Sequence, residues 1–405
     1  MRARAQAEWH RLHGVLMHEP GIEVFFALIS PKKHLYERFF NLDAAHREHQ
    51  RLCEVLKDEF GVRVHRLTDA ALEGVQNPRH RETLLNLAEE PAGETDLALA
   101  GRDDRHLLAR AILGACQNGG EVTLRGTMHN LYFMRDQQVC TDQGMVMGRM
   151  ATTERQREGA LTGIALSAIG AGPVGLIRRG HLEGGDFIPA GKFALLGYGS
   201  RTDREGADAL LWAGSSFDEV AVVREPVHPL IEGADPMVNM HLDTYCNLAG
   251  DGVAVGNPAL LERAEVKVLA NESGIYRPTG WEGSLAGFLK EKDFSIVPVT
   301  TLEQLCYAAN FLCVRERECV AVDTGQVARA VIKRLRMRAA AKPGVYDRLL
   351  AQAETDYRQL RLDAEFFPFK KEVYAEGVEM TPIDLHHATG GYGGAHCMTC
   401  PVRRG

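Results

Sequence analysis

A glycine-rich loop near the C-terminus delivers the residue best suited to nucleophilic chemistry. Residues 390–395 read Gly-Gly-Tyr-Gly-Gly-Ala and lead directly into His396 and Cys397. Glycine has no Cβ, so such a loop can bend sharply and a ligand can approach its backbone closely. A cysteine at the end of this loop, with a histidine beside it, is placed as a nucleophile rather than as core filler. The sequence therefore predicts that Cys397 is a catalytic thiol.

The same segment contains a C-x-x-C motif, which is also typical of zinc and redox sites. It is formed by Cys397 and Cys400 and is followed by Pro401. A structural zinc site needs four ligands, and the sequence has no second C-x-x-C to supply them. A redox pair usually opens a helix after a strand early in a small domain, whereas this one lies beside the C-terminus. The pattern favours the nucleophile over metal or redox use.

Two further segments could present carboxylates to a cleft. Residues 130–136 read Asn-Leu-Tyr-Phe-Met-Arg-Asp, an apolar run that ends on Asp136 as at a strand tip. A surface ion pair is the alternative for this segment. Residues 183–186 read Glu-Gly-Gly-Asp, and the two glycines permit a tight turn. Glu183 and Asp186 could then face one cavity, although exposed acids on an ordinary turn would have the same sequence.

A third segment pairs a histidine with an aspartate. Residues 240–244 read Met-His-Leu-Asp-Thr. If this chain is extended, His241 and Asp243 lie on the same face, because side chains alternate along a strand. A histidine and a carboxylate that converge in this way suit general acid–base catalysis beside a bound cation. A buried structural histidine is the alternative, so this segment depends on the others for its interpretation.

The composition is typical of a soluble globular protein, with 405 residues of which 45% are hydrophobic and 25% charged. The net charge of −7 argues against a nucleic-acid-binding protein. The one basic run, at 333–338, is expected to be a solvated helix face. No segment approaches the roughly 18 apolar residues of a membrane span, and the first residues lack a signal-peptide core. The expected location is the reducing cytoplasm, with most of the nine cysteines as buried thiols.

Short apolar runs alternate with helical patterns along most of the chain. A strand at 15–17 is followed by a helix at 46–60 and by a strand at 62–67, and similar pairs recur. Repeated units of this kind predict an α/β fold. Residues 68–125 look purely helical instead and are interpreted as a helical insertion. The whole chain, 1–405, is expected to form a single catalytic domain around this insertion.

In combination, the four segments resemble the motifs of a known family. Asn-Leu-Tyr-Phe-x-Arg-Asp, Glu-Gly-Gly-Asp, Met-His-Leu-Asp-Thr and a terminal Gly-Gly-x-His-Cys-Met-Thr are similar, in this order, to those of the arginine deiminases in the guanidine-modifying superfamily. The resemblance includes His-Glu-Pro-Gly at 18–21 and covers most of the chain. It is thinnest in 22–45, in the helical insertion and in 300–385.

The resemblance implies a fold and a set of catalytic roles. The fold is the pentein, a five-bladed pseudo-symmetric α/β propeller around a central active site, and no metal or organic cofactor is required. By motif match, Cys397 would be the nucleophile and His241 the general acid and base. Asp136 and Asp243 would hold the substrate guanidinium through paired hydrogen bonds, since it is a planar cation that donates from every nitrogen. Glu183 would complete the acidic pocket beside the histidine.

Substrate-binding residues also follow from the resemblance. Arg155 and Arg201 match family positions that hold the amino-acid carboxylate, with a surface charge as the alternative for each. Asn130 matches a third contact, and Asp186 is included as the second acid of Glu-Gly-Gly-Asp. Tyr392 stands five residues before the nucleophile, where the family commonly carries an arginine that gates the pocket.

A second departure lies in the N-terminal substrate loop. The family has an apolar-Phe-Asp-Asp pattern there, whereas residues 33–39 read Lys-His-Leu-Tyr-Glu-Arg-Phe. Since this loop and the residue at 392 both differ, the substrate could differ from free L-arginine.

The predicted reaction is the hydrolysis of L-arginine, or of a close guanidino compound, to citrulline and ammonia through a covalent thiouronium on the cysteine. The alternative is an amidinotransferase that passes the amidino group to an amine. Glu183 favours hydrolysis, because the transferases resemble Asp-Ala-Ala-Asp at 183–186, whereas the tail at 400–405 resembles a transferase ending. A non-catalytic binding module is disfavoured, because such relatives lose the cysteine and histidine. The expected partner is a small guanidino substrate, neither nucleic acid nor membrane, and homo-oligomer formation is left open.

Overall fold

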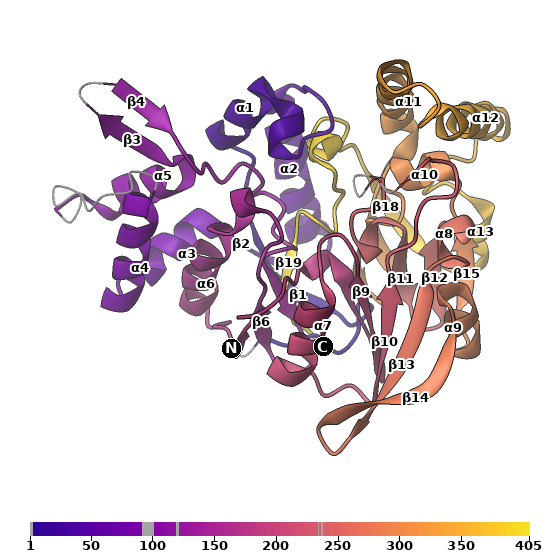
Figure 1. Ribbon diagram of the computed structural model, residues 1–405, viewed down its shortest axis with the longest axis horizontal. Coiled ribbons are helices and arrows are strands. Elements are labelled where there is room, and N and C mark those ends of the chain that lie inside the picture. Colours follow the sequence, from indigo (N-terminus) through magenta and orange to yellow (C-terminus); the bar gives the residue numbers. More distant parts are fainter. Residues whose placement is uncertain (1–2, 91–100, 119–120, 234, 236–237) are drawn as a thin grey trace.

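The structure is a computed structural model that describes residues 3–90, 101–118, 121–233, 235 and 238–405. The chain has the mixed α/β fold that the sequence predicts (Figure 1). Its strands are β1 (Leu12–Met17), β2 (Arg63–Arg66), β3 (Ala115–Asn118), β4 (Glu121–Leu124), β5 (Gln138–Cys140), β6 (Met145–Met147), β7 (Gly175–Leu176), β8 (Phe187–Ala190), β9 (Phe193–Tyr198), β10 (Glu219–Arg224), β11 (Cys246–Gly250), β12 (Val253–Gly256), β13 (Glu265–Glu272), β14 (Ile275–Ser284), β15 (Ser295–Pro298), β16 (Leu312–Arg315), β17 (Glu318–Val322), β18 (Glu379–Ile383) and β19 (Cys400–Arg404).

Thirteen α-helices connect these strands in the described part of the chain. They are α1 (Ile22–Ile29), α2 (Leu42–Glu54), α3 (Leu67–Gly74), α4 (Pro78–Glu89), α5 (Asp104–Leu113), α6 (Glu158–Ala168), α7 (Arg204–Gly214), α8 (Pro258–Leu261), α9 (Leu285–Glu291), α10 (Thr301–Leu305), α11 (Thr324–Ala341), α12 (Asp347–Asp363) and α13 (Lys371–Ala375). None of the helices in the described residues is long and apolar enough to cross a membrane.

One strand-pairing pattern recurs in five of the six sheets that the described residues form. In each, two strands pair antiparallel and a third strand then joins the second in parallel. The five sets are β19-β1-β2, β5-β6-β7, β8-β9-β10, β11-β12-β15 and β16-β17-β18. The sheet that contains β8, β9 and β10 has two more strands, β13 and β14, beyond β10. The closure of these sheets into a five-bladed propeller remains a prediction.

The first and last strands of the chain pair with each other. β1 lies antiparallel to β19, with Leu16 opposite Cys400, and parallel to β2. The first and last described segments therefore lie side by side, and Arg4 also forms a bridge with Arg403. This pairing fixes the nucleophile loop, because the loop ends where β19 begins.

Local sequence accounts for the strands and helices that surround the site. Both faces of β9 and β10 are covered, so these strands are continuous apolar runs and do not alternate with polar residues. Side-chain caps begin the helices that follow. Asp203 accepts a hydrogen bond from the Gly206 N–H at the start of α7. Thr300 and Glu303 form a reciprocal capping box at the start of α10.

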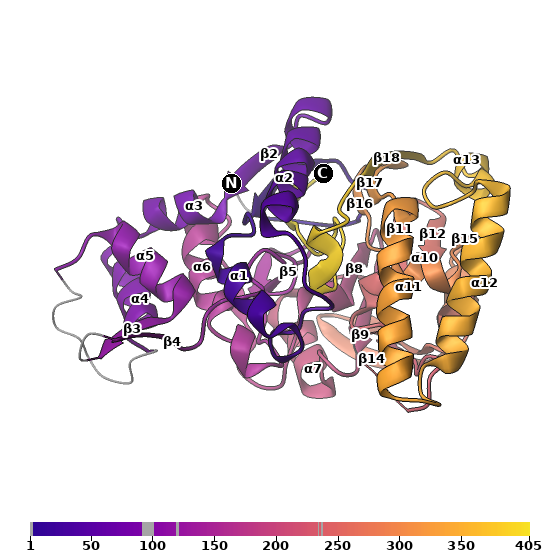
Figure 2. The same cartoon turned by 90° about the horizontal axis from the view of Figure 1, so that it is seen from above.

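The region 68–125 is not purely helical, in contrast to the prediction. It contains most of α3, the whole of α4 and α5, and the antiparallel hairpin of β3 and β4. The predicted N-terminal cap of α4 is present: the Asn77 side chain accepts a hydrogen bond from the Arg79 N–H, and Pro78 lies in the first turn. The hairpin was missed because its strands are four residues each, too short for a period of two to show. Figures 1 and 2 place this region at the opposite end of the molecule from α11 and α12. Its interpretation as an insertion remains a prediction.

Candidate active site

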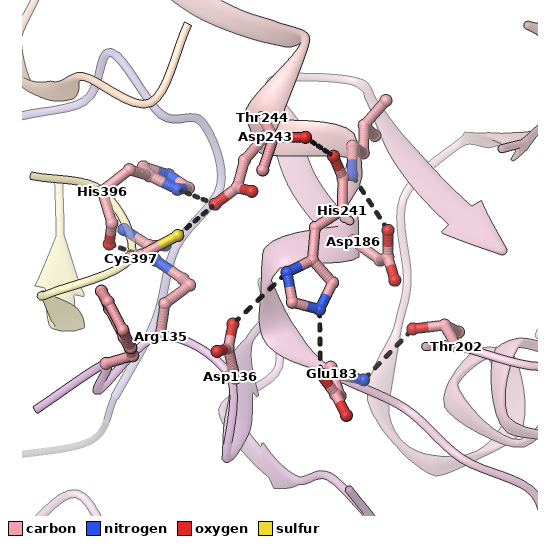
Figure 3. A network of polar contacts seen from close by, with 12 residues as sticks. Arg135, Asp136, Glu183, Asp186, Thr202, His241, Asp243, Thr244, His396 and Cys397 are labelled. Carbon is pink, nitrogen blue, oxygen red and sulfur yellow. Dashed lines mark hydrogen bonds and ion pairs between the residues drawn. The ribbon is translucent and has the colours of Figure 1, made fainter. Parts of the chain in front are cut away.

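The predicted catalytic residues share one structural position, the segment that leads into the edge strand of a sheet. Asp136 precedes β5, Glu183 precedes β8, His241 and Asp243 precede β11, and Cys397 precedes β19. The sheets therefore bring together side chains that lie up to 261 positions apart in the sequence. Figure 3 shows these side chains around one space, with the Cys397 sulfur facing the His241 ring across it.

The imidazole of His241 lies between two carboxylates. Its Nε2 is 2.9 Å from Oε2 of Glu183, and its Nδ1 is 3.8 Å from Oδ1 of Asp136. Burial alone would lower the pKa of His241, but the charge of Asp136 and the hydrogen bond to Glu183 outweigh it and raise the pKa to about 10. The ring is therefore an imidazolium at neutral pH and can act as a proton donor.

Two further hydrogen bonds hold Glu183 in place, and a neighbouring glycine leaves room for the His241 ring. Its Oε1 accepts from the Ala151 N–H at 2.9 Å, and its own N–H donates to Thr202 Oγ1 at 3.1 Å. Burial raises the pKa of Glu183, but the hydrogen bond and charge of His241 prevail and lower it to about 2. Gly185 is needed for space, because a Cβ there would lie 2.9 Å from Cγ of the His241 ring. The Glu-Gly-Gly-Asp motif thus lets the backbone pass close under the imidazole.

In Asp136 and in Asp243, one carboxylate oxygen contacts a neighbouring basic side chain and the other has no hydrogen-bond partner among the described residues. Oδ2 of Asp136 binds Nη1 of Arg155 at 2.6 Å, and Oδ2 of Asp243 lies 2.7 Å from Nδ1 of His396. The Oδ1 atom of each is buried and accepts no hydrogen bond from any described residue. The two carboxylates lie on either side of the space between the sulfur and the imidazole (Figure 3). Buried carboxylate oxygens without donors suit a ligand that is a cation and a multiple donor.

Cys397 is buried with its sulfur beside the acidic pair. Sγ lies 3.6 Å from Oδ2 of Asp243, and the side chain is 3% exposed. Burial, followed by the negative charges of Asp243 and Asp136, raises the pKa of this thiol well above its ordinary range. The resting cysteine is therefore protonated, and a cation bound between the carboxylates would favour its thiolate.

Asn310 is a site residue that the sequence analysis missed. Its Oδ1 accepts from the N–H groups of Gly394 (2.8 Å) and Cys397 (3.1 Å), and its Nδ2 donates to the Asp243 carbonyl at 3.2 Å. It thus joins the nucleophile loop to the His241 segment. A signal was available, because Asn310 precedes β16 in the same way that the other site residues precede their strands.

The predicted carboxylate-binding arginines lie within the site's own charge network. The Nη2 atom of Arg155 is 2.9 Å from Glu158, and its Nη1 binds Asp136. Arg201 is buried, and its charge contributes to the lowered pKa of Glu183. Both arginines lie near the predicted acids, and their contact with a substrate remains a prediction.

The other predicted substrate contacts are placed as follows. The Asn130 side chain donates to the His34 carbonyl at 3.1 Å, which ties the 31–40 segment to the site. Oδ1 of Asp186 accepts from the Leu242 N–H at 3.0 Å, and burial raises the pKa of Asp186 to about 7. Tyr392 is half-buried in a left-handed conformation, φ 73°, and its ring centroid lies 5.8 Å from Cζ of Arg334. The loop position at which the family commonly carries an arginine is thus occupied by Tyr392. The ring of Tyr392 lies beside Arg334, an arginine supplied by α11.

A metal ion is a poor fit to the acidic cluster. Ligand atoms of Asp136, Glu183 and His241 lie within 4.8 Å of one another. A metal-bound imidazole must be neutral with a lone pair at the metal, whereas both nitrogens of His241 face carboxylates and carry protons. The cluster suits a hydrogen-bonding cation better than a metal.

Comparisons with known proteins agree with this chemistry. A sequence model described as arginine deiminase matches residues 32–90 and 99–404. The arginine deiminase of Halobacterium salinarum is 25% identical over 500 aligned residues, which cover 100% of this chain and 97% of that protein.

Solved structures with the same fold have lower sequence identity. An amidinotransferase of the saxitoxin pathway from Microseira wollei aligns with a TM-score of 0.55 at 11% identity, covering 99% of this chain and 97% of that one. DDAH from Pseudomonas aeruginosa, in complex with citrulline, aligns with a TM-score of 0.51 at 13% identity, covering 98% and 100%. At these identities the likeness shows the fold alone.

Proposed function

The chain belongs to the arginine deiminase family, and on that premise we propose that it hydrolyses L-arginine, or a close guanidino compound, to citrulline and ammonia. As a family member it is a hydrolase that acts on C–N bonds of guanidino groups. One observation carries the assignment to these residues: a buried thiol lies beside two carboxylates with available oxygens, opposite an imidazolium.

Substrate binding would activate the thiol. The guanidinium would donate N–H groups to Oδ1 of Asp136 and Oδ1 of Asp243, the two oxygens without a donor among the described residues. Its positive charge would then lie beside Sγ of Cys397 and offset the two charges that raise the thiol pKa. The thiol would lose its proton to solvent and become a thiolate within reach of the guanidinium carbon.

The first half of the reaction would form a covalent adduct. The thiolate attacks the guanidinium carbon and a C–S bond forms. The His241 imidazolium donates its proton to one terminal nitrogen, the C–N bond breaks, and ammonia leaves. A thiouronium remains on Cys397 and His241 is neutral.

The second half would restore the enzyme. Neutral His241 takes a proton from a water molecule as the water attacks the thiouronium carbon. The C–S bond then breaks as the hydroxyl proton passes to the departing sulfur, so the thiol is restored and the neutral ureido product forms. Glu183 stabilises the imidazolium at both stages, because it accepts a hydrogen bond from Nε2.

We also propose that the five similar sheets surround this site as the blades of a propeller. In support, the segment before the edge strand of each sheet supplies a residue of the site, namely Cys397, Asp136, Glu183, His241 and Asn310. Under this proposal the region 68–125 is an insertion on that body.

The test is a product assay on the full-length protein. Arginine, agmatine and small guanidino acids are incubated with and without an amine acceptor, and ammonia, ureido products and new guanidino products are quantified. Ureido product and ammonia without acceptor support hydrolysis. Guanidino product that forms only with acceptor, together with ornithine from arginine, would instead assign the amidinotransferase alternative.

Mass spectrometry of the acid-quenched reaction provides a second test. An amidino-type adduct on the peptide that carries Cys397 is expected during turnover. An adduct confined to another cysteine, or none under rapid quench while product still forms, would contradict the covalent route.

A further inference from the structure

A chain of buried charges runs behind the nucleophile, from Asp243 through His396 to Glu8. Nδ1 of His396 lies 2.7 Å from Oδ2 of Asp243, and its Nε2 lies 3.6 Å from Oε1 of Glu8. The side chains of all three residues are at most 1% exposed. The imidazole of His396 therefore lies between two carboxylates, as the imidazole of His241 does.

Glu8 reaches this position from the N-terminal segment. Its N–H donates to the Pro189 carbonyl at 2.9 Å, and Ala7 pairs with Ala190 at the end of β8. Its Oε2 binds Nη2 of Arg404 at 2.6 Å, and its Oε1 lies 3.5 Å from Nη1 of Arg135. Burial raises the pKa of Glu8, but the two arginines lower it far below its ordinary value, so the group is ionised.

Glu8 lies outside the part of the chain that the arginine deiminase model matches, which begins at residue 32. No motif of the sequence analysis includes it. Its partners His396, Arg135 and Arg404 all lie within the matched residues.

Glu8 and Asp243 hold the ring of His396 from opposite sides. Each ring nitrogen faces a carboxylate, which orients the ring with Nδ1 toward Asp243. His396 in turn supports Asp243. Burial raises the pKa of Asp243, but the hydrogen bond and charge of His396 lower it below its ordinary value. The bond to Oδ2 also fixes the carboxylate so that Oδ1 remains available.

We propose that Glu8 is a positioning residue for the reaction: through His396 it keeps Asp243 ionised and oriented to receive the guanidinium. The inference rests on the proposed function, because it assigns Asp243 to the substrate cation. Two further charged groups act on Asp243, namely His241 and Arg135. Neither is substituted in the experiment below, although Arg135 loses its contact with the Glu8 carboxylate in Glu8→Gln.

The first experiment compares Glu8→Gln with wild type in the pH dependence of kcat/KM for arginine. Asp243 must be ionised to bind the cation, so its pKa in the free enzyme sets the acidic limb. Glutamine keeps the shape of the side chain but removes the charge that faces Nε2 of His396. We expect the acidic limb to move to higher pH by about one unit, and KM to rise by up to about tenfold at pH values below the wild-type limb. Glu8→Asp retains the charge, so its acidic limb should lie closer to that of the wild type than the acidic limb of Glu8→Gln does.

A purely structural role would give a different result. It would lower kcat/KM uniformly as the folded fraction falls, without moving the limb. Glu303→Gln is the matched control, since Glu303 is fully buried and pairs with Lys370 at 2.9 Å without contacting the catalytic residues. An acidic limb in Glu8→Gln that coincides with those of wild type and Glu303→Gln overturns the proposal.

A second measurement does not depend on turnover. Cys397 is alkylated with cationic 2-chloroacetamidine and with neutral 2-chloroacetamide, and the ratio of the two rates is taken. Loss of charge at Asp243 should reduce this ratio by up to about tenfold in Glu8→Gln at pH values below the wild-type acidic limb, whereas partial unfolding raises both rates together. If wild type hydrolyses no guanidino compound, the proposed function fails, while this ratio still tests the link from Glu8 to Asp243.

If Glu8→Gln does not fold, His396→Asn replaces it. Asparagine retains a neutral donor near Oδ2 of Asp243 and removes the charged link to Glu8. The same shift of the acidic limb is expected. An unshifted limb and an unchanged alkylation ratio would overturn the proposal.

Discussion

At the scale of single residues, the site holds two imidazoles, each between carboxylates, with one thiol between them. His241 lies between Glu183 and Asp136, and His396 lies between Asp243 and Glu8. Burial, together with the negative charges of Asp243 and Asp136, keeps the thiol of Cys397 protonated in the absence of a cation. Such a thiol would be protected from adventitious alkylation and oxidation until a cationic substrate binds, because the thiolate is the reactive form.

The two cysteines of the C-x-x-C motif should behave differently. We expect Cys397→Ala to reduce kcat at least about a thousandfold, because the covalent step is lost. Cys400 lies at the start of β19, buried in an apolar cluster, so Cys400→Ala should lower the free energy of unfolding by about 1 kcal/mol and leave kcat within a few-fold. Steady-state kinetics and urea unfolding of both variants check this. A severe loss from Cys400→Ala together with an active Cys397→Ala would reverse the assignment.

The raised pKa of His241 predicts a specific pH response in Glu183→Gln. Under the proposed mechanism His241 must be protonated to release ammonia, and its pKa of about 10 keeps it so at neutral pH. When Glu183 loses its charge, the folded-state pKa of His241 falls, so the alkaline limb of kcat should move to lower pH by at least about one unit. The maximum kcat should fall about a hundredfold. A pH–rate profile measures both quantities, and an alkaline limb that stays in place or moves upward would contradict the assigned role.

At the scale of elements, the segment from Pro31 to Phe40 is held against the nucleophile loop. Glu37 pairs with Arg334 of α11 at 2.6 Å, and its N–H donates to the Gly390 carbonyl at 2.7 Å. A cavity beside these residues, lined among others by Thr244, Tyr307 and Tyr392, has a volume of ≈ 10 Å³. That is about the space of one water molecule. None of Cys397, His241 and Asp136 lines this cavity, and Cys397 is only 3% exposed, so a substrate can reach the sulfur only if neighbouring segments move.

Glu37→Gln should loosen this closed arrangement. Removing one charge of a buried pair leaves Arg334 without its counter-ion and weakens the contact between the two segments. Because the Cys397 side chain is only 3% exposed, we expect alkylation by neutral 2-chloroacetamide to accelerate about tenfold, with a higher KM for arginine. The control is Glu54→Gln, whose carboxylate is 58% exposed in its pair with Arg51. Equal alkylation rates in Glu37→Gln and wild type would show that the pair does not restrain the segment.

At the scale of the whole molecule, the sequence predicted which side chains gather at the site better than what surrounds them. Cys397, His241, Glu183, Asp136 and Asp243 could be singled out because each belongs to a short local motif, and the sheets then bring them together. Asn310 and Glu8 belong to no such motif. Their roles arise only when β16 and the N-terminal segment are brought beside β19 and β8, which is a consequence of tertiary pairing. The hairpin of β3 and β4 was missed for a different reason, since strands of four residues carry too little periodicity.

The pairing of the chain ends should matter to the stability of the whole domain. Arg404, in β19, is 2% exposed, binds Oε2 of Glu8 at 2.6 Å and donates to the Cys313 carbonyl at 2.8 Å. It thereby ties the last strand to the N-terminal segment and to β16. Replacing it with methionine keeps much of the side-chain volume but leaves Glu8 as a buried charge without its closest counter-ion.

We therefore expect Arg404→Met to lower the free energy of unfolding by about 3–5 kcal/mol, as for the loss of one partner of a buried ion pair. The neighbouring Arg403→Met is the control, because Arg403 is partly exposed and no charge is left buried by its removal. Urea unfolding followed by circular dichroism and by fluorescence measures both variants. If β19 closes one cooperative domain, the two probes should give coincident transitions in Arg404→Met at a lower midpoint. A midpoint equal to that of Arg403→Met would mean that the joined ends contribute little to the stability of the fold that surrounds the site.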